Sequence, residues 1–161
     1  MSDKERTIRI AGIVRESIVD GPGIRFVVFA QGCPHKCPGC HNPQTHDFQG
    51  GYDCSIETIL LEIDKNPLLA GVTFSGGEPF CQAERFLPLA KEIKNRRLDL
   101  VAYTGYTLEQ LQDMAAVDQH ISQLLSKLDV LIDGPFILEE RDLTLQFRGS
   151  RNQRYIQMDK R

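Results

Sequence analysis

The chain has 161 residues, enough for one domain with a hydrophobic core, and its 41% hydrophobic and 25% charged residues are typical of a globular protein. A formal net charge of −3 argues against general affinity for nucleic acid. No apolar run approaches the roughly 20 residues that cross a bilayer, and the polar start MSDKERT lacks the apolar centre of a signal peptide. We therefore expect a single domain over residues 1–161, in the cytoplasm, with neither membrane nor nucleic acid as a partner.

Short apolar runs that are partly β-branched and bounded by Gly or Pro predict strands buried on both faces. They are IRFVVFA (24–30), GVTFS (71–75), LDLVAY (98–103) and DVLID (129–133), and TIRIAGIV (7–14) predicts a further strand before them. Helical patterns lie between them: an apolar face within 56–63 behind Ser55, the amphipathic segment 82–97, a helix opened by the capping box of Thr107 and Gln110, and 119–128. The alternation predicts an α/β protein with a mostly parallel sheet. Because a complete eight-fold barrel takes about 250 residues, we expect an open, partial (β/α) barrel.

Each of the four core strands runs into a polar loop that contains glycine. The loops have the sequences FAQGC, FSGGEP, YTGYT and IDGPF. In parallel α/β folds such loops gather at the carboxyl edge of the sheet, where ligands bind. The four loops are therefore expected to form one site.

Three cysteines lie close together in the loop FAQGCPHKCPGCHNP (29–43), where Pro and Gly disfavour a helix. Cys33, Cys37 and Cys40 have the spacing CxxxCxxC, which in a chain with an odd total of five cysteines favours metal or redox chemistry over a disulfide framework. Zinc with His41 as fourth ligand, covalent haem at CPGCH, inert reduced thiols and an iron–sulfur cluster are the interpretations. Zinc sites usually assemble two short ligand pairs and haem attachment needs an exported protein, so the cluster is favoured.

Three thiolates would leave one iron of a four-iron cluster without a protein ligand, because a closed electron-transfer cluster takes four cysteines. An open iron can bind a substrate. If Cys54 or Cys81 supplied the fourth thiolate, the chain would be a simple electron carrier. Both are isolated in the sequence, which favours ordinary, partly buried cysteines.

The CxxxCxxC loop followed by SGGEP (75–79) resembles the radical S-adenosylmethionine superfamily. Within it, VDGPGIRFVVFAQGCPHKCPGCHNPQT, YTGYT, and the end of the chain from DVLIDGPF to RDLTLQFRGSRNQR are similar to the activating proteins of anaerobic ribonucleoside-triphosphate reductase. The resemblance runs from about residue 8 to 156. It implies that Cys33, Cys37 and Cys40 hold a 4Fe-4S cluster whose free iron binds S-adenosylmethionine.

The resemblance also implies residues around the nucleoside and the methionine amino group. The implied cofactor-binding residues are Gly39, Cys40, His41, Gly76, Gly77 and Glu78. Gly76 and Gly77 suit a close approach of backbone to ligand, and Glu78 either supports the ammonium group or caps the following helix, of which we favour the first. Position 39, often aromatic in the superfamily, is Gly here, so other loops must hold adenine.

The remaining polar residues near the strand ends have two interpretations each. Tyr103, Thr104 and Tyr106 either line the pocket or pack against the fold. Asp133 binds a ligand or makes a turn, and Asp20 shapes the entrance of the site or makes a turn. His35 is assigned to a surface or structural role.

The activity implied by the resemblance is that of an oxidoreductase that activates a glycyl-radical enzyme. One electron from the reduced cluster cleaves S-adenosylmethionine to methionine and a 5′-deoxyadenosyl radical, which removes a hydrogen atom from a glycine of the reductase; no side-chain acid or base is required. The implied partners are the glycyl-radical subunit of the reductase and a reduced flavodoxin- or ferredoxin-like electron donor. The alternatives are the activase of another glycyl-radical enzyme, such as pyruvate formate-lyase, and a non-catalytic iron–sulfur or metal-binding electron-transfer module.

The C-terminal segment 141–161 differs in charge from the rest of the chain. It has six basic and two acidic side chains, a charge of +4, which leaves −7 on the remainder. The stretch LTLQFRGSRNQRYI alternates apolar and polar residues like a final strand or clasp. It is either a solvated edge strand or a docking surface in which Arg148, Arg151 and Arg154 contact the reductase.

Overall fold

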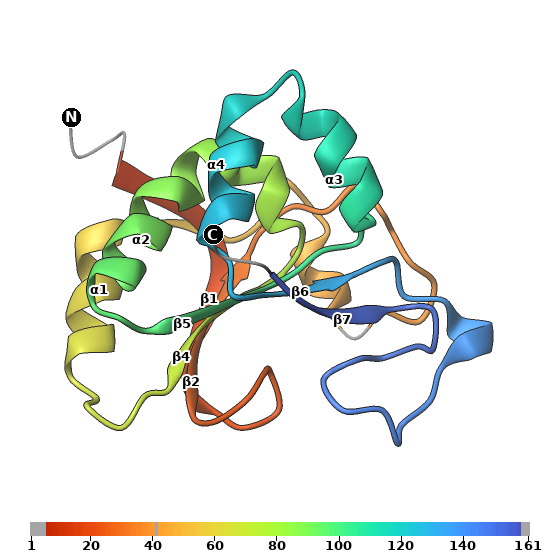
Figure 1. The fold of residues 1–161 in the computed structure, drawn as a ribbon, viewed down its shortest axis with the longest axis horizontal. Helices are drawn as coiled ribbons and strands as arrows, with labels where there is room; N and C mark the ends of the chain where they lie inside the picture. Colours follow the sequence, from red (N-terminus) through yellow and green to blue (C-terminus); the bar gives the residue numbers. More distant parts are fainter. Residues whose placement is uncertain (1–5, 41, 159–161) are drawn as a thin grey trace.

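The computed structural model describes residues 6–40 and 42–158. Seven strands form one open sheet in the order β3-β1-β2-β4-β5-β6-β7 (Figure 1). Their bounds are β1 Thr7–Ser17, β2 Arg25–Ala30, β3 Tyr52–Ser55, β4 Gly71–Gly76, β5 Asp99–Tyr103, β6 Val130–Asp133 and β7 Arg154–Gln157.

The middle of the sheet is parallel and its edges are antiparallel. Parallel pairing joins β2 to β4, β4 to β5 and β5 to β6. The strand β1 runs against both β2 and β3, and β7 runs against β6. The α/β class and the mostly parallel, open sheet predicted from the sequence are confirmed. Of the stretch 143–156, predicted to be a final strand or clasp, only the last three residues lie in a strand, β7.

Within residues 6–40 and 42–158, four α-helices pack on one face of the sheet (Figure 1). They are α1 Ile56–Asp64, α2 Ala83–Asn95, α3 Leu108–Ala115 and α4 Gln119–Lys127. Their starts follow the predicted signals: the Ser55 side chain accepts a hydrogen bond from the backbone N–H of Thr58, and Thr107 forms the capping box with Gln110. None of the described helices is long and apolar enough to cross a membrane.

The two faces of the central strands carry different side chains. In β4, Val72 and Phe74 enter the main hydrophobic core against the helices, where the ring of Phe74 lies 4.6 Å from that of Phe86. Because strand side chains alternate, Thr73 and Ser75 point to the opposite face. That face bears the loop between β1 and β2 and the segment 134–153, which lie on the side of the sheet away from the helices (Figure 1). It is also the face on which the candidate site is built.

The strand β3 was not predicted from the sequence. Its residues, YDCS, are mostly polar and largely exposed, and they are held by antiparallel pairing with residues Thr7 to Ile10 of β1. Short edge strands of this kind depend on their neighbour more than on their own apolar pattern.

Candidate functional site

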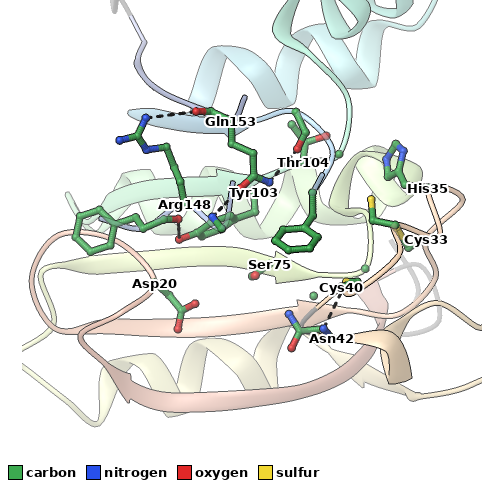
Figure 2. Close-up of a pocket in the computed structure, with 18 of the residues that line it drawn as sticks. Asp20, Cys33, His35, Cys40, Asn42, Ser75, Tyr103, Thr104, Arg148 and Gln153 are labelled. Carbon is green, nitrogen blue, oxygen red and sulfur yellow. Dashed lines mark hydrogen bonds between the residues drawn. The ribbon is translucent and has the colours of Figure 1, made fainter. Parts of the chain in front are cut away.

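A cavity of about 580 Å³ lies at the carboxyl edge of the parallel strands. Its walls include the cysteine loop, Ser75 to Gly77 at the end of β4, Tyr103 to Gly105 at the end of β5, and Gly134 and Phe136 after β6. The convergence of the four strand-end loops is therefore confirmed. Figure 2 shows Cys33 and Cys40 at one end of this cavity and Asp20 and Arg148 at the other.

All three cysteines of the CxxxCxxC loop line this cavity. Cys33 is 8% exposed, while Cys37 and Cys40 are half-buried. The loop is anchored by backbone hydrogen bonds from Gly32 to the carbonyl of Thr45 (2.7 Å) and from Cys33 to that of His46 (3.1 Å). Burial raises the pKa of the Cys33 and Cys37 thiols, so binding of metal at these sulfurs must displace protons.

The arrangement of these thiols suits a polynuclear group better than a single ion. A zinc ion needs its sulfur ligands about 2.3 Å away, and within residues 6–40 and 42–158 no three Cys, His, Asp or Glu side chains converge closely enough to hold one ion. All three thiols line one cavity, and a four-iron cluster would take each of them on a separate iron.

Neither of the other two cysteines is part of the cavity wall. Cys54 lies in β3 at the sheet edge and packs against the main core. Cys81 lies in the 3₁₀ helix Pro79–Gln82, where burial of the thiol raises its pKa to about 11. A closed cluster held by four cysteines would therefore lack its fourth thiol, because neither Cys54 nor Cys81 lines the cavity.

The Gly-Gly-Glu loop packs directly on the cysteine loop. Gly77 donates to the carbonyl of Ala30 and Glu78 donates to that of Gly32, both at 2.8 Å. A Cβ atom on Gly77 would lie 2.4 Å from the carbonyl oxygen of Gly32, and Gly76 has a φ of +90°, in the region that favours glycine. The cysteine-loop backbone therefore leaves no room for a side chain at Gly77. Both glycines also line the cavity, and their close approach to a ligand stays a prediction.

The carboxylate of Glu78 is wholly buried and is not on the cavity wall. It accepts hydrogen bonds from the N–H of Phe80 (3.2 Å), the Thr104 hydroxyl (2.9 Å) and the N–H of Gly105 (2.8 Å), and its Oε1 lies 2.7 Å from Nε2 of His35. The first of these caps the 3₁₀ helix, the alternative to ammonium support. A direct contact of Glu78 with a ligand stays a prediction.

Comparisons with known proteins show the family to which this chain belongs. Residues 19–156 match the family model described as a 4Fe-4S single cluster domain. The chain is 35% identical to the anaerobic ribonucleoside-triphosphate reductase-activating protein of Haemophilus influenzae and 36% identical to that of Vibrio cholerae, over 84% of this chain and 89% of each relative. It is 31% identical to the activating protein of Escherichia coli K12, over 84% of this chain and 90% of that relative. The chain belongs to the family of anaerobic ribonucleoside-triphosphate reductase-activating proteins.

A solved structure supports the fold of this family member. The crystal structure of QueE from Escherichia coli superposes with a TM-score of 0.51 over 65% of this chain and 55% of that one, at 19% identity. At this identity the likeness concerns the fold alone. An iron–sulfur cluster is thus indicated by the family model, and the three cavity-lining cysteines are the residues that could hold it.

Gly39 and His41 are the residues of the predicted cofactor-binding set that flank Cys40 in the cysteine loop. His41 lies outside the described residues. Gly39 has a φ of +76°, and a Cβ atom there would lie 2.9 Å from Leu138 and 3.3 Å from Phe136. An aromatic side chain at position 39 would therefore collide with the 134–153 segment, which occupies that space instead.

Of the polar residues with two interpretations, Tyr103, Thr104 and Asp20 line the cavity, whereas Tyr106 and Asp133 are not among its lining residues. The Tyr103 hydroxyl donates to the carbonyl of Phe147 at 2.7 Å, although this tyrosine also borders the cavity. Asp133 is buried and paired with Arg154, and it accepts from the N–H of Leu108 at 2.7 Å. Asp20 does border the cavity and accepts from the Ser17 hydroxyl at 2.6 Å.

Asn42 and Ser75 line the cavity and were not assigned a role from the sequence. Figure 2 shows both near Cys40. The alternation within β4 was the available signal for Ser75, since it places that side chain on the face opposite Phe74. Arg148, predicted as a docking residue, also belongs to the cavity wall.

Proposed function

We propose that this chain is a radical S-adenosylmethionine activase that generates a glycyl radical on anaerobic ribonucleoside-triphosphate reductase. The observation that carries the proposal is the position of Cys33, Cys37 and Cys40 on one wall of a cavity whose adjacent wall is the Gly-Gly loop. The names of the relatives supply the reductase as the protein acted on. When bound, the 4Fe-4S cluster supplies one electron to S-adenosylmethionine, whose cleavage yields the radical that takes a hydrogen atom from glycine.

The chain's own residues would bind and shelter these groups. The three thiolates would ligate three irons and leave the fourth facing the cavity. A volume of about 580 Å³ is within the range of small-molecule sites, and Gly76 and Gly77 expose backbone rather than side chains along one wall. Tyr103, Phe136 and Phe147 supply apolar surface that would limit the access of water to a radical.

The cavity must also admit a glycine of another protein. Its mouth is bordered by Ile18 and Val19, whose exposures of 74% and 70% leave their apolar side chains in solvent. Exposed apolar side chains beside a pocket are typical of a protein-binding surface. As the electron donor we propose a reduced flavodoxin- or ferredoxin-like protein of the cytoplasm.

Anaerobic reconstitution of the full chain tests the function. We expect iron and acid-labile sulfide in equal amounts, a reduced-state electron paramagnetic resonance (EPR) spectrum that changes with S-adenosylmethionine, and methionine plus 5′-deoxyadenosine as products. Addition of the anaerobic reductase should give a glycyl-radical signal. Replacing Cys33, Cys37 or Cys40 by Ala should abolish cluster and cleavage together, whereas Cys54→Ala should retain both.

The outcomes separate the alternatives. A cluster without S-adenosylmethionine cleavage would indicate an electron-transfer module. Cleavage with a radical formed on pyruvate formate-lyase but not on the reductase would indicate another activase. Stoichiometric zinc without sulfide would contradict the cluster.

A further inference from the structure

The side chain of His35, between the first two cysteines of the loop, is turned into the protein. It is 15% exposed, and its Nε2 lies 2.7 Å from Oε1 of the fully buried Glu78 (Figure 2 shows His35 beside Cys33). The other partners of this carboxylate are hydroxyl and backbone N–H donors, so Glu78 acts as the acceptor and Nε2 of His35 as a donor.

The surroundings of the His35 ring are shaped to receive it. The ring of Tyr106 contacts it edge-on, with centroids 4.5 Å apart and planes at 79°. A Cβ atom on Gly105 would lie 2.3 Å from a ring carbon of His35, so a glycine is needed at that position for the ring to fit. Two residues of the β5 loop therefore form a slot for one residue of the cysteine loop.

Glu78 connects this slot to the rest of the site. Its carboxylate also binds the Thr104 hydroxyl and the N–H of Gly105, and it caps the 3₁₀ helix through Phe80. One buried carboxylate thus joins the loops that follow β2, β4 and β5. Since a buried carboxylate needs its donors, loss of one weakens the junction of all three loops.

We propose that His35 is a positioning residue that clamps the cysteine loop, through Glu78, to the loops after β4 and β5, and so holds the thiols on the cavity wall before a cluster is inserted. Its bearing on cluster retention rests on the proposed function, whereas the clamp itself consists of contacts between residues of the chain. The ring contacts Glu78 and Tyr106, and the residue also lines the cavity.

The first measurement is hydrogen–deuterium exchange of the full-length, cluster-free protein. In His35→Ala, backbone exchange should rise about tenfold within residues 33–40 and 104–106, as expected for the loss of one hydrogen bond to a charged group, and stay unchanged in β4 and α2. In His35→Gln, whose amide can donate to Glu78, exchange should return towards that of the parent protein. His120→Ala, which removes a histidine from α4, is the matched control and should change none of these segments.

The second measurement is the rate at which reconstituted protein loses iron to a chelator. We expect about tenfold faster loss for His35→Ala than for the parent, and near-parent rates for His35→Gln and His120→Ala. Unchanged exchange in a folded His35→Ala protein would overturn the clamp, as would equal exchange increases over the whole chain without rescue by Gln. If the parent protein formed no cluster, the proposed function would fail while the exchange result would still decide the clamp.

Discussion

Arg154 fastens the last strand to the body of the protein. Its guanidinium pairs with buried Asp133 and with Glu109, and these hydrogen bonds raise the pKa of Arg154 further above its ordinary value. Asp133 in turn accepts from the N–H of Leu108 at the start of α3. Arg154, one of the three arginines that the sequence suggested as docking residues, therefore forms its ion pairs within the protein.

Replacement of Arg154 by Ala is expected to destabilise the protein by about 1–3 kcal/mol, because a buried carboxylate loses a partner. Urea unfolding followed by circular dichroism would measure this change. Arg151→Ala, at an exposed position of the same segment, should change the free energy of unfolding by less than about 0.5 kcal/mol. Equal stability of the two variants would contradict a structural role for Arg154.

Cys81 should react slowly with alkylating reagents although its residue is exposed at the surface. Burial of the thiol, followed by the negative charge of Glu78, raises its pKa to about 11. A raised pKa leaves less thiolate at neutral pH, about a hundredfold less than for a thiol with the ordinary value of 9.0. Mass spectrometry at pH 8 should therefore show slower alkylation in the folded than in the urea-unfolded chain, with a folded-state rate that keeps rising towards pH 11. Equal rates in both states would contradict the shift.

At the scale of elements, the site depends on close packing between two loops. The carbonyl of Gly32 accepts from the N–H of Glu78 and faces Gly77 without room for a side chain. Substitution at Gly77 must therefore move the cysteine loop as well as alter the cavity wall.

Gly77→Ala should lower stability by about 1–3 kcal/mol and weaken cluster retention, because the new methyl group must displace the Gly32 carbonyl. Thermal unfolding and the iron content after reconstitution measure the two effects. Gly12→Ala is a suitable control, because a Cβ atom at Gly12 in β1 would meet nothing within 4 Å. Full iron content together with parent stability in Gly77→Ala would show that the loops can separate without cost.

The elements themselves were largely predictable. The strands β2, β4, β5 and β6 are apolar runs that would be buried in almost any α/β arrangement, and the helix caps are local signals. The strand β3 was missed because its pairing with β1 is a long-range contact. The environment of Glu78 was inaccessible for the same reason, since three of its partners, His35, Thr104 and Gly105, lie 26 to 43 residues from it along the chain. Spacing singled out the three cysteines that line the cavity, whereas the junction of loops behind them required the fold.

On the scale of the whole molecule, the basic C-terminal segment does not act as one unit. Arg154 is paired, Arg148 belongs to the cavity wall, and Arg141 and Arg151 are exposed. A docking role for the segment stays a prediction, and the exposed pair is where it can be tested without disturbing the fold.

Reversal of charge in the double variant Arg141→Glu and Arg151→Glu should reduce glycyl-radical yield on the reductase while leaving uncoupled S-adenosylmethionine cleavage unchanged. The deficit should be largest at low salt and shrink as salt screens the charges. A double reversal of Lys91 and Lys127, on α2 and α4 in the helical layer, serves as the charge-matched control. Normal radical yield at low salt would remove the docking role, and loss of uncoupled cleavage would assign the exposed pair to the cofactor site.

The segment 134–153 leaves the sheet after Asp133 and returns at Arg154, and these two residues face each other across the β6–β7 ladder. Its ends are thus held together by the stem, whatever the course of the chain between them. Because the entropy of closing such a loop grows slowly with its length, insertions and deletions there cost the sheet little. A change of length within this segment is therefore expected to leave the β6–β7 pairing in place, but it would remodel the cavity wall, to which Phe136, Phe147 and Arg148 belong.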